Sequence, residues 1–245
     1  MIQEYHGDTL YRLEYLPTVL IPILFALIDS NISIFKVILP IFGWCFLAIG
    51  GFLMNDVIDK DRNLELGHRS LLILCLLCLM FGFYLIGNHS FYFALLFTIL
   101  GVLYNWKLKF IPVFKNVFLV ALVGLPYLAF TNNVHILTIL AFCFLGLFAE
   151  FTHSLADKDA TFQYLQKKTL YLAFFASLCF LIFSSINIIF ADPCYFVPLS
   201  IIALFSTIGF LLIWNKPGKW PTVKKLGTEI FKLFTLYLLI ILLFK

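Results

Sequence analysis

Carboxylate and amide side chains gather where an apolar run ends, in the stretch NDVIDKDRN. Asn55, Asp59 and Asn63 are spaced at i, i+4 and i+8, so they share one face if a helix continues past Met54. Asp56 and Asp61 lie within the same stretch. These oxygen-bearing groups are suited to binding a hard divalent cation.

A second polar cluster, THSLADKDAT, follows another apolar run about a hundred residues later and repeats the tripeptide Asp-Lys-Asp. If this helix also continues, His153, Asp157 and Thr161 form a second stripe, with Asp159 close by. Two facing carboxylate stripes would repel each other unless cations neutralised them. Mg²⁺ uses one or two carboxylates together with phosphate oxygens and water, so the pair of clusters favours a diphosphate site. The alternative is that both clusters are solvated helix ends.

Basic residues between the clusters could close on a phosphate: Arg69, Lys107, Lys109 and Lys158. Lysine and arginine also concentrate on the cytoplasmic side of membrane proteins for reasons of topology alone. For each single lysine, both interpretations stay open. No nucleic-acid partner is expected.

The segments that carry these clusters are apolar throughout. The chain is 62% hydrophobic and 12% charged, with a mean hydropathy of +1.02, whereas soluble domains are about a quarter charged. Long, continuous apolar runs predict membrane-spanning helices rather than strands. We therefore expect an all-α, multi-pass membrane protein with about nine spans, at residues 14–30, 34–54, 71–87, 90–104, 115–131, 134–152, 169–190, 195–214 and 229–244.

The distribution of basic residues predicts the orientation of these spans. With a cytoplasmic N-terminus, all 17 lysines and arginines except Lys36 and Lys245 fall on the cytoplasmic side. The polar clusters lie on that side too, so we expect a cell (inner) membrane protein with a cytoplasmic-side active site. Cys75 and Cys78 form a C-x-x-C inside an apolar run, and we interpret them as small buried hydrophobic residues.

Related segments end successive spans, which suggests an internal repeat. NDVIDKD resembles THSLADKD, and LYNWK resembles IWNKP. We expect a single transmembrane domain with four-helix halves at about 14–114 and 115–228, followed by a final helix at 229–244.

At these residues the chain resembles the UbiA superfamily of intramembrane prenyltransferases. NDVIDKDRN is similar to the family's first signature, N-D-x-x-D-x-x-x-D; HSLADKDATFQYLQKKTL is similar to the second, and LYNWKLKFIPVFKN to the region after the fourth helix. The resemblance implies nine helices, Mg²⁺, and transfer of a prenyl group from a prenyl diphosphate to an aromatic or other lipid-precursor acceptor, as in quinone biosynthesis. It implies the following roles: Asp56, Asp59 and Asp157 in catalysis; Asn55, Asp59 and Asp157 as Mg²⁺ ligands, with Asp61, Asp159 and His153 as candidate additional ligands; and Arg69, Tyr104, Lys107, Lys109 and Lys158 in diphosphate binding.

Three positions depart from the family pattern. Asn63 and Thr161 stand where carboxylates are usual, and Leu108 stands where the Y-x-x-x-K spacing has lysine. Asp61 and Asp159 could compensate only if the helix ends unwind, since i+2 lies on another side of a regular helix. We therefore predict that the chain is not helical through both motifs, or that it needs more Mg²⁺, which Asn63→Asp with Thr161→Asp would reduce.

Three other functions remain as alternatives. A terpene cyclase of the same superfamily would need no acceptor. A noncatalytic homologue would only bind isoprenoids. A transporter would have polar groups at mid-membrane, and here they lie at one face.

Overall fold

The computed structural model describes residues 16–59, 67–131, 134–190 and 193–244. Within these ranges the chain is all-helical, as predicted, and contains no strand. The helices are α1 (Pro17–Asp29), α2 (Ile34–Asp59), α3 (His68–Ile86), α4 (Phe91–Trp106), α5 (Phe114–Phe130), α6 (Ile136–Asp157), α7 (Ala160–Leu165), α8 (Lys167–Phe190), α9 (Pro193–Ile213) and α10 (Trp220–Phe244), with short 3₁₀ turns η2 (Leu108–Phe110) and η3 (Pro217–Lys219).

Each of the nine predicted spans coincides with one of the nine longer helices. Six of them, α2, α3, α6, α8, α9 and α10, are long and apolar enough to cross a membrane, which makes the chain a multi-pass membrane protein. The helices α1, α4 and α5 are apolar but shorter. The count of nine spans therefore stays a prediction.

Several helices extend beyond their apolar segments. Helix α2 ends at Asp59 rather than 54, and α6 at Asp157 rather than 152, so both polar clusters begin on helix. Helix α10 begins at Trp220 rather than 229. Pro221 lies in its first turn, where proline is tolerated because the backbone N–H has no helical partner. The residues predicted as a loop at 220–228 are therefore helical.

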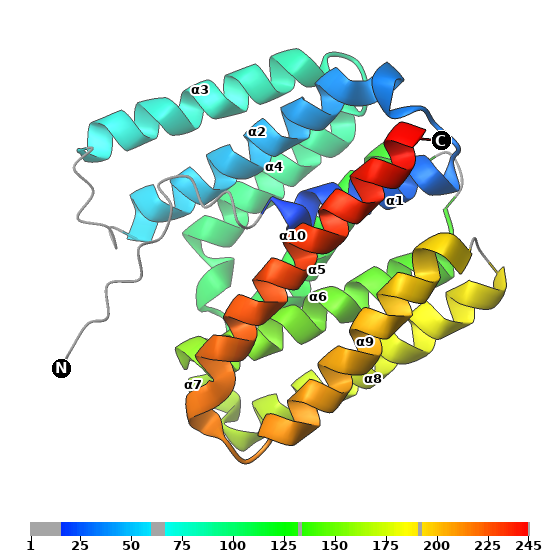
Figure 1. Cartoon of the computed structure of the whole chain (residues 1–245). Helices are drawn as coiled ribbons and strands as arrows, with labels where there is room; N and C mark the ends of the chain where they lie inside the picture. Colours follow the sequence, from blue (N-terminus) through cyan, green and yellow to red (C-terminus); the bar gives the residue numbers. More distant parts are fainter. Residues whose placement is uncertain (1–15, 60–66, 132–133, 191–192, 245) are drawn as a thin grey trace.

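The helices form two outer groups around a central one (Figure 1). Helix α2 packs against α3 and α4 on one side, and α8 packs against α6 and α9 on the other. Helix α1 lies between them and packs against α5 and α10. Its residues Ile23, Leu24 and Phe25 are fully buried, so this short proline-containing helix forms the centre of the core.

Glycines allow α2 and α3 to approach each other closely. A Cβ on Gly43 would lie 2.7 Å from the carbonyl oxygen of Gly82, and a Cβ on Gly82 would lie 2.9 Å from that of Gly43. Small residues commonly permit such backbone contact between membrane helices. Cys75 and Cys78 are buried and free on α3, as predicted, and Cys75 donates its S–H to the Gly50 carbonyl.

Candidate functional site

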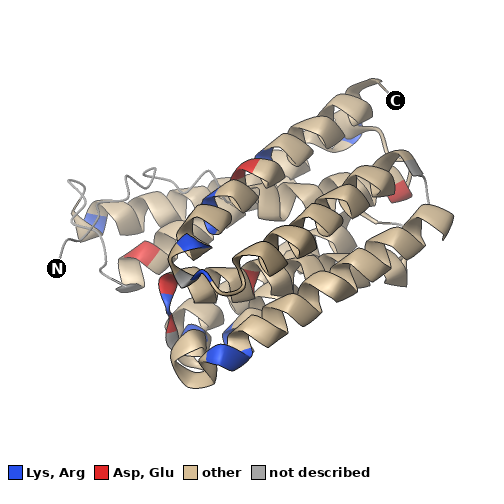
Figure 2. Cartoon of the chain, turned by 60° about the horizontal axis from the view of Figure 1, so that its bottom comes forward, with Lys and Arg blue, Asp and Glu red and all other residues tan. Residues whose placement is uncertain are grey.

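Charged residues collect at one end of the helix bundle (Figure 2). Helices α2 and α6 finish here, and α5 and α10 begin here, so the polar clusters meet basic residues from other elements. We call this region the polar end. It is built by three groups of contacts, around Asp159, Asp157 and Asn55.

The second cluster does not continue as a single helix. Lys158 adopts a left-handed conformation (φ 51°, ψ 41°) that ends α6, and Asp159 then caps α7. The carboxylate Oδ1 of Asp159 accepts from the backbone N–H groups of Thr161 (2.9 Å) and Phe162 (3.2 Å). The break predicted for this motif is confirmed. The three-residue stripe is wrong, because only His153 and Asp157 share a helix face; their Nε2 and Oδ2 atoms lie 2.6 Å apart.

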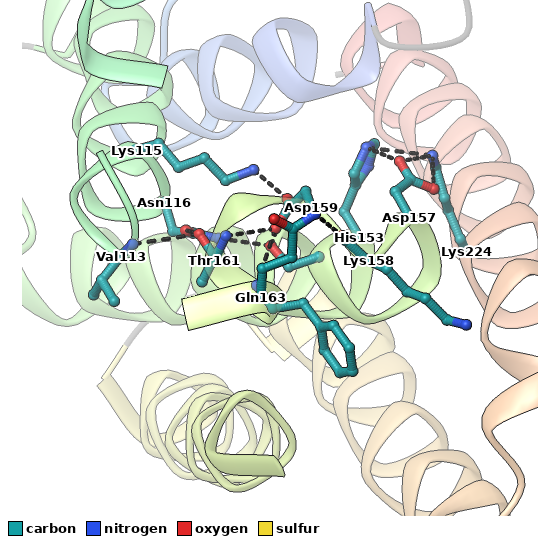
Figure 3. A network of polar contacts seen from close by, with 12 residues as sticks. Val113, Lys115, Asn116, His153, Asp157, Lys158, Asp159, Thr161, Gln163 and Lys224 are labelled. Carbon is teal, nitrogen blue, oxygen red and sulfur yellow. Dashed lines mark hydrogen bonds and ion pairs between the residues drawn. The ribbon is translucent and has the colours of Figure 1, made fainter. Parts of the chain in front are cut away.

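Thr161 is fully buried in a polar network (Figure 3). Its hydroxyl donates to Oδ1 of Asn116 (2.9 Å) and accepts from the backbone N–H of Val113 (3.3 Å). Asn116 in turn donates to Ser154 on α6 (3.3 Å). Thr161 therefore joins α5 and α7.

Asp159 forms an ion pair with Lys115 of α5 and accepts from the Ser154 hydroxyl (2.9 Å). Both of its oxygens are thus engaged by protein donors. Partial burial alone would raise the pKa of Asp159, but the Lys115 ammonium and the hydrogen bonds outweigh burial and hold it below its usual value. The carboxylate is therefore ionised as a helix cap, which is a structural use of a residue predicted as an additional metal ligand.

Asp157 contacts Lys224, which comes from α10 (Figure 3). The Lys224 ammonium donates to both carboxylate oxygens (2.8 and 3.1 Å) and lies 3.3 Å from Nε2 of His153. The sequence interpretation assigned Lys224 no role, because the residue lies in a segment interpreted as a loop. If the last helix had been predicted to begin at Trp220, Lys224 would have been placed one turn into that helix.

The first cluster meets η2 of the α4–α5 connection. Lys109 donates to Oδ1 of Asn55 (3.3 Å), and Asp56 is buried beside it on α2. The 3₁₀ turn explains how lysine reaches this point although Leu108 occupies the expected position. The side chain of Asp59, and Asp61 and Asn63 entirely, lie outside the described residues.

The α4–α5 connection links the two clusters. Lys109 contacts the first and Val113 the second, and four residues span at most about 14 Å. Val113 has φ 65° and ψ −49°, and the N–H of Phe114 donates to the Pro112 carbonyl (2.7 Å). This is a γ-turn with positive φ, a rare and strained form, centred on a β-branched residue. The strain lies where the connection meets Thr161.

No family model and no curated protein matches this chain. Solved structures do. A structure described as a digeranylgeranylglyceryl phosphate synthase in membranes shares 22% identity over 95% of each chain, with a TM-score of 0.68. A UbiA homologue from Archaeoglobus fulgidus bound to GPP and Mg²⁺ shares 16% identity over 95% of this chain and 98% of that one, with a TM-score of 0.72. A further structure of a UbiA homologue from that organism, bound to DMAPP and Mg²⁺, has a TM-score of 0.66 at 16% identity over 91% and 95% of the two chains.

This chain therefore shares the fold of these UbiA homologue structures. Within that fold, Lys109 contacts the motif residue Asn55, and the diphosphate-binding roles of Arg69, Tyr104, Lys107 and Lys158 stay predictions. Lys107 lies over its neighbour Trp106 (4.9 Å to the ring centroid), and Tyr104 stacks on Phe118. Arg69 is exposed in the first turn of α3, and the exposed Lys158 extends away from Thr161 (Figure 3). The contacts made by Lys115 and Lys224 were not predicted.

The donor set of the polar end suits a hard cation. Among the described residues, no three His, Cys, Asp or Glu side chains come together as a metal site. However, Mg²⁺ typically binds through one or two carboxylates and completes its shell with substrate phosphates and water. Asn55, Asp56 and Asp157 carry side-chain oxygens of the kind that Mg²⁺ binds, and the Asp157 side chain is 42% exposed.

Proposed function

We propose that this protein transfers a prenyl group from a prenyl diphosphate to a hydrophobic or aromatic acceptor within the membrane. The supporting observation is that the α4–α5 connection links both polar clusters while lysines from η2, α5 and α10 contact them. A diphosphate carries several negative charges and needs such surroundings. The fold shared with structures that bind GPP or DMAPP with Mg²⁺ supports the same substrate class.

We propose Asn55, Asp59 and Asp157 as the residues that hold Mg²⁺. Asp61 and His153 are candidate additional ligands, whereas the capping contacts of Asp159 make it the least available. Bound Mg²⁺ would supply positive charge that stabilises the departing diphosphate.

The reaction begins as the allylic C–O bond of the donor breaks and its electron pair leaves with the diphosphate. Lys109 and Lys224 hold the phosphate oxygens at the mouth of the bundle and offset their growing charge. The allylic cation is then captured by the acceptor, which loses a proton. Apolar side chains must exclude water from the cation.

The test uses purified protein in detergent with Mg²⁺, radiolabelled prenyl diphosphates of several lengths, and phenolic and lipid acceptors. Transfer would be supported if labelled lipid forms and diphosphate is released only when an acceptor is present. Asp157→Asn should reduce transfer by at least about a hundredfold, the scale of losing one electrostatic contact to a developing charge. Donor consumption without an acceptor would indicate a cyclase.

A second function, binding without transfer, is favoured by one observation. Thr161 and Asp159 are used to join α5, α6 and α7, which leaves fewer carboxylates for metal binding than the family pattern offers. Tight binding of prenyl diphosphate with no product from any donor and acceptor pair would establish this alternative.

A further inference from the structure

An acidic residue of α6, Glu150, has no role in the site described above. It lies seven residues before Asp157, about 10 Å deeper into the membrane along the helix. Ionisable residues within membrane helices are costly and usually mark functional sites. Packing alone therefore does not account for a carboxylate at this position.

Glu150 faces the inner side of the polar end. Residues 150, 153 and 157 are spaced at i, i+3 and i+7, which places Glu150 on the helix face that carries His153 and Asp157. It is partly buried and interacts electrostatically with His153, Lys115 and Lys224. In the described part of the chain Glu150 makes no hydrogen bond or ion pair, so its oxygens are available to a ligand.

Helix α10 leaves room at the matching depth. Lys224 fixes α10 against α6, and Gly227 lies one turn deeper on α10. A Cβ added to Gly227 would meet no atom within 4 Å. Thr228, the next residue, is only partly buried. The space around Gly227 is therefore open at about the depth of Glu150, below the diphosphate contacts.

We propose that Glu150 accepts the proton released by the second substrate. This inference rests on the proposed prenyl transfer. The allylic C–O bond breaks and its electrons leave with diphosphate; the acceptor's oxygen, or the aromatic carbon activated by its hydroxyl, bonds to the allylic carbon. The proton from that atom passes to the Glu150 carboxylate and then to water. Lys109 and Lys224 keep the phosphates of the donor at the mouth of the bundle. The acceptor therefore lies deeper, beside Glu150.

The experiment compares the parent with Glu150→Gln, Glu150→Asp and Glu150→Ala. Transfer from geranyl diphosphate is measured to 4-hydroxybenzoate and to a monoalkyl glycerol phosphate. We expect Glu150→Gln to lower kcat by about 10² to 10⁴, the usual contribution of a positioned base, with affinity for geranyl diphosphate and thermal unfolding unchanged. Glu150→Asp should keep more activity than Glu150→Gln. Added formate should restore activity to Glu150→Ala, which a structural role would not produce.

The matched control is Glu229→Gln, which removes an exposed carboxylate paired with Lys232 on α10. It should transfer like the parent. Two results would overturn this inference and leave prenyl transfer standing. In the first, the parent is active and the kcat of Glu150→Gln is within threefold of the parental kcat. In the second, Glu150→Gln and Glu150→Asp lose equal amounts of activity. A parent that binds donor but transfers to no acceptor would overturn both this inference and prenyl transfer.

Discussion

At the scale of single residues, the polar end is held together by lysines that contact carboxylate and amide side chains. Asn55, Asp157 and Asp159 each meet an ammonium group from a different element, η2, α10 and α5. Removing a lysine should therefore weaken anion binding without disturbing the apolar core. Lys224 offers the clearest case, since its contacts are to side chains at the mouth.

We expect Lys224→Met to weaken prenyl diphosphate binding about tenfold, the effect of losing one charge-assisted contact of about 1.4 kcal/mol. Competition against labelled donor measures the change. Lys225→Met is the matched control, because the adjacent Lys225 is exposed. Equal binding by the Lys224 variant and the parent would contradict a phosphate-binding role for Lys224.

The Thr161→Asp substitution should lower the stability of the protein, an effect that the sequence did not suggest. The Thr161 hydroxyl is fully buried between Val113 and Asn116, next to the ionised Asp159. Thr161→Asp would bury a second carboxylate there with no described cation left to pair with it. We expect destabilisation of about 3–5 kcal/mol and a lower midpoint of thermal unfolding in detergent. Thr161→Ser, which keeps the hydroxyl, should unfold near the parental temperature.

At the scale of elements, the γ-turn at Val113 is the strained part of the site. Such a conformation costs about 1–3 kcal/mol for a β-branched residue, and Gly adopts it without strain. Val113→Gly should therefore raise the free energy of unfolding by about 1 kcal/mol, after the entropy cost of Gly is subtracted. The same change at Val117, exposed and helical on α5, should instead lower it by about 0.5 kcal/mol. Thermal unfolding of both variants measures the difference, and destabilisation by Val113→Gly would show that the turn is unstrained.

The elements themselves were largely predictable, and their ends were not. Apolar runs located all nine longer helices, because both lipid and core demand apolar side chains. Hydropathy could not show that α2, α6 and α10 continue into polar sequence, since a helix outside the apolar region needs no apolar residues. Lys158 ends α6 without a glycine signal. The contacts of Lys115 and Lys224 join residues 44 and 67 positions apart, and local spacing carries no information about them.

At the scale of the molecule, one orientation should follow from the distribution of charge. The polar end carries most of the basic residues, which favours the cytoplasmic side. Reporter fusions after Phe244 and an inserted tag at Asn88 should both report the external side. A tag in the connection at residues 107–113 should report the cytoplasm. A cytoplasmic signal after Phe244 would contradict the nine-span topology.

The pairing of Asp157 with Lys224 also affects how the protein is made. The two residues are 67 positions apart in the chain. At a synthesis rate of about 5–20 residues per second, the ribosome adds Lys224 roughly 3–13 s after Asp157. During that interval α6 enters the membrane with its acidic end unmatched by α10. Until α10 arrives, water and the neighbouring His153 solvate this exposed carboxylate, so the docking of α10 is the step that completes the polar end.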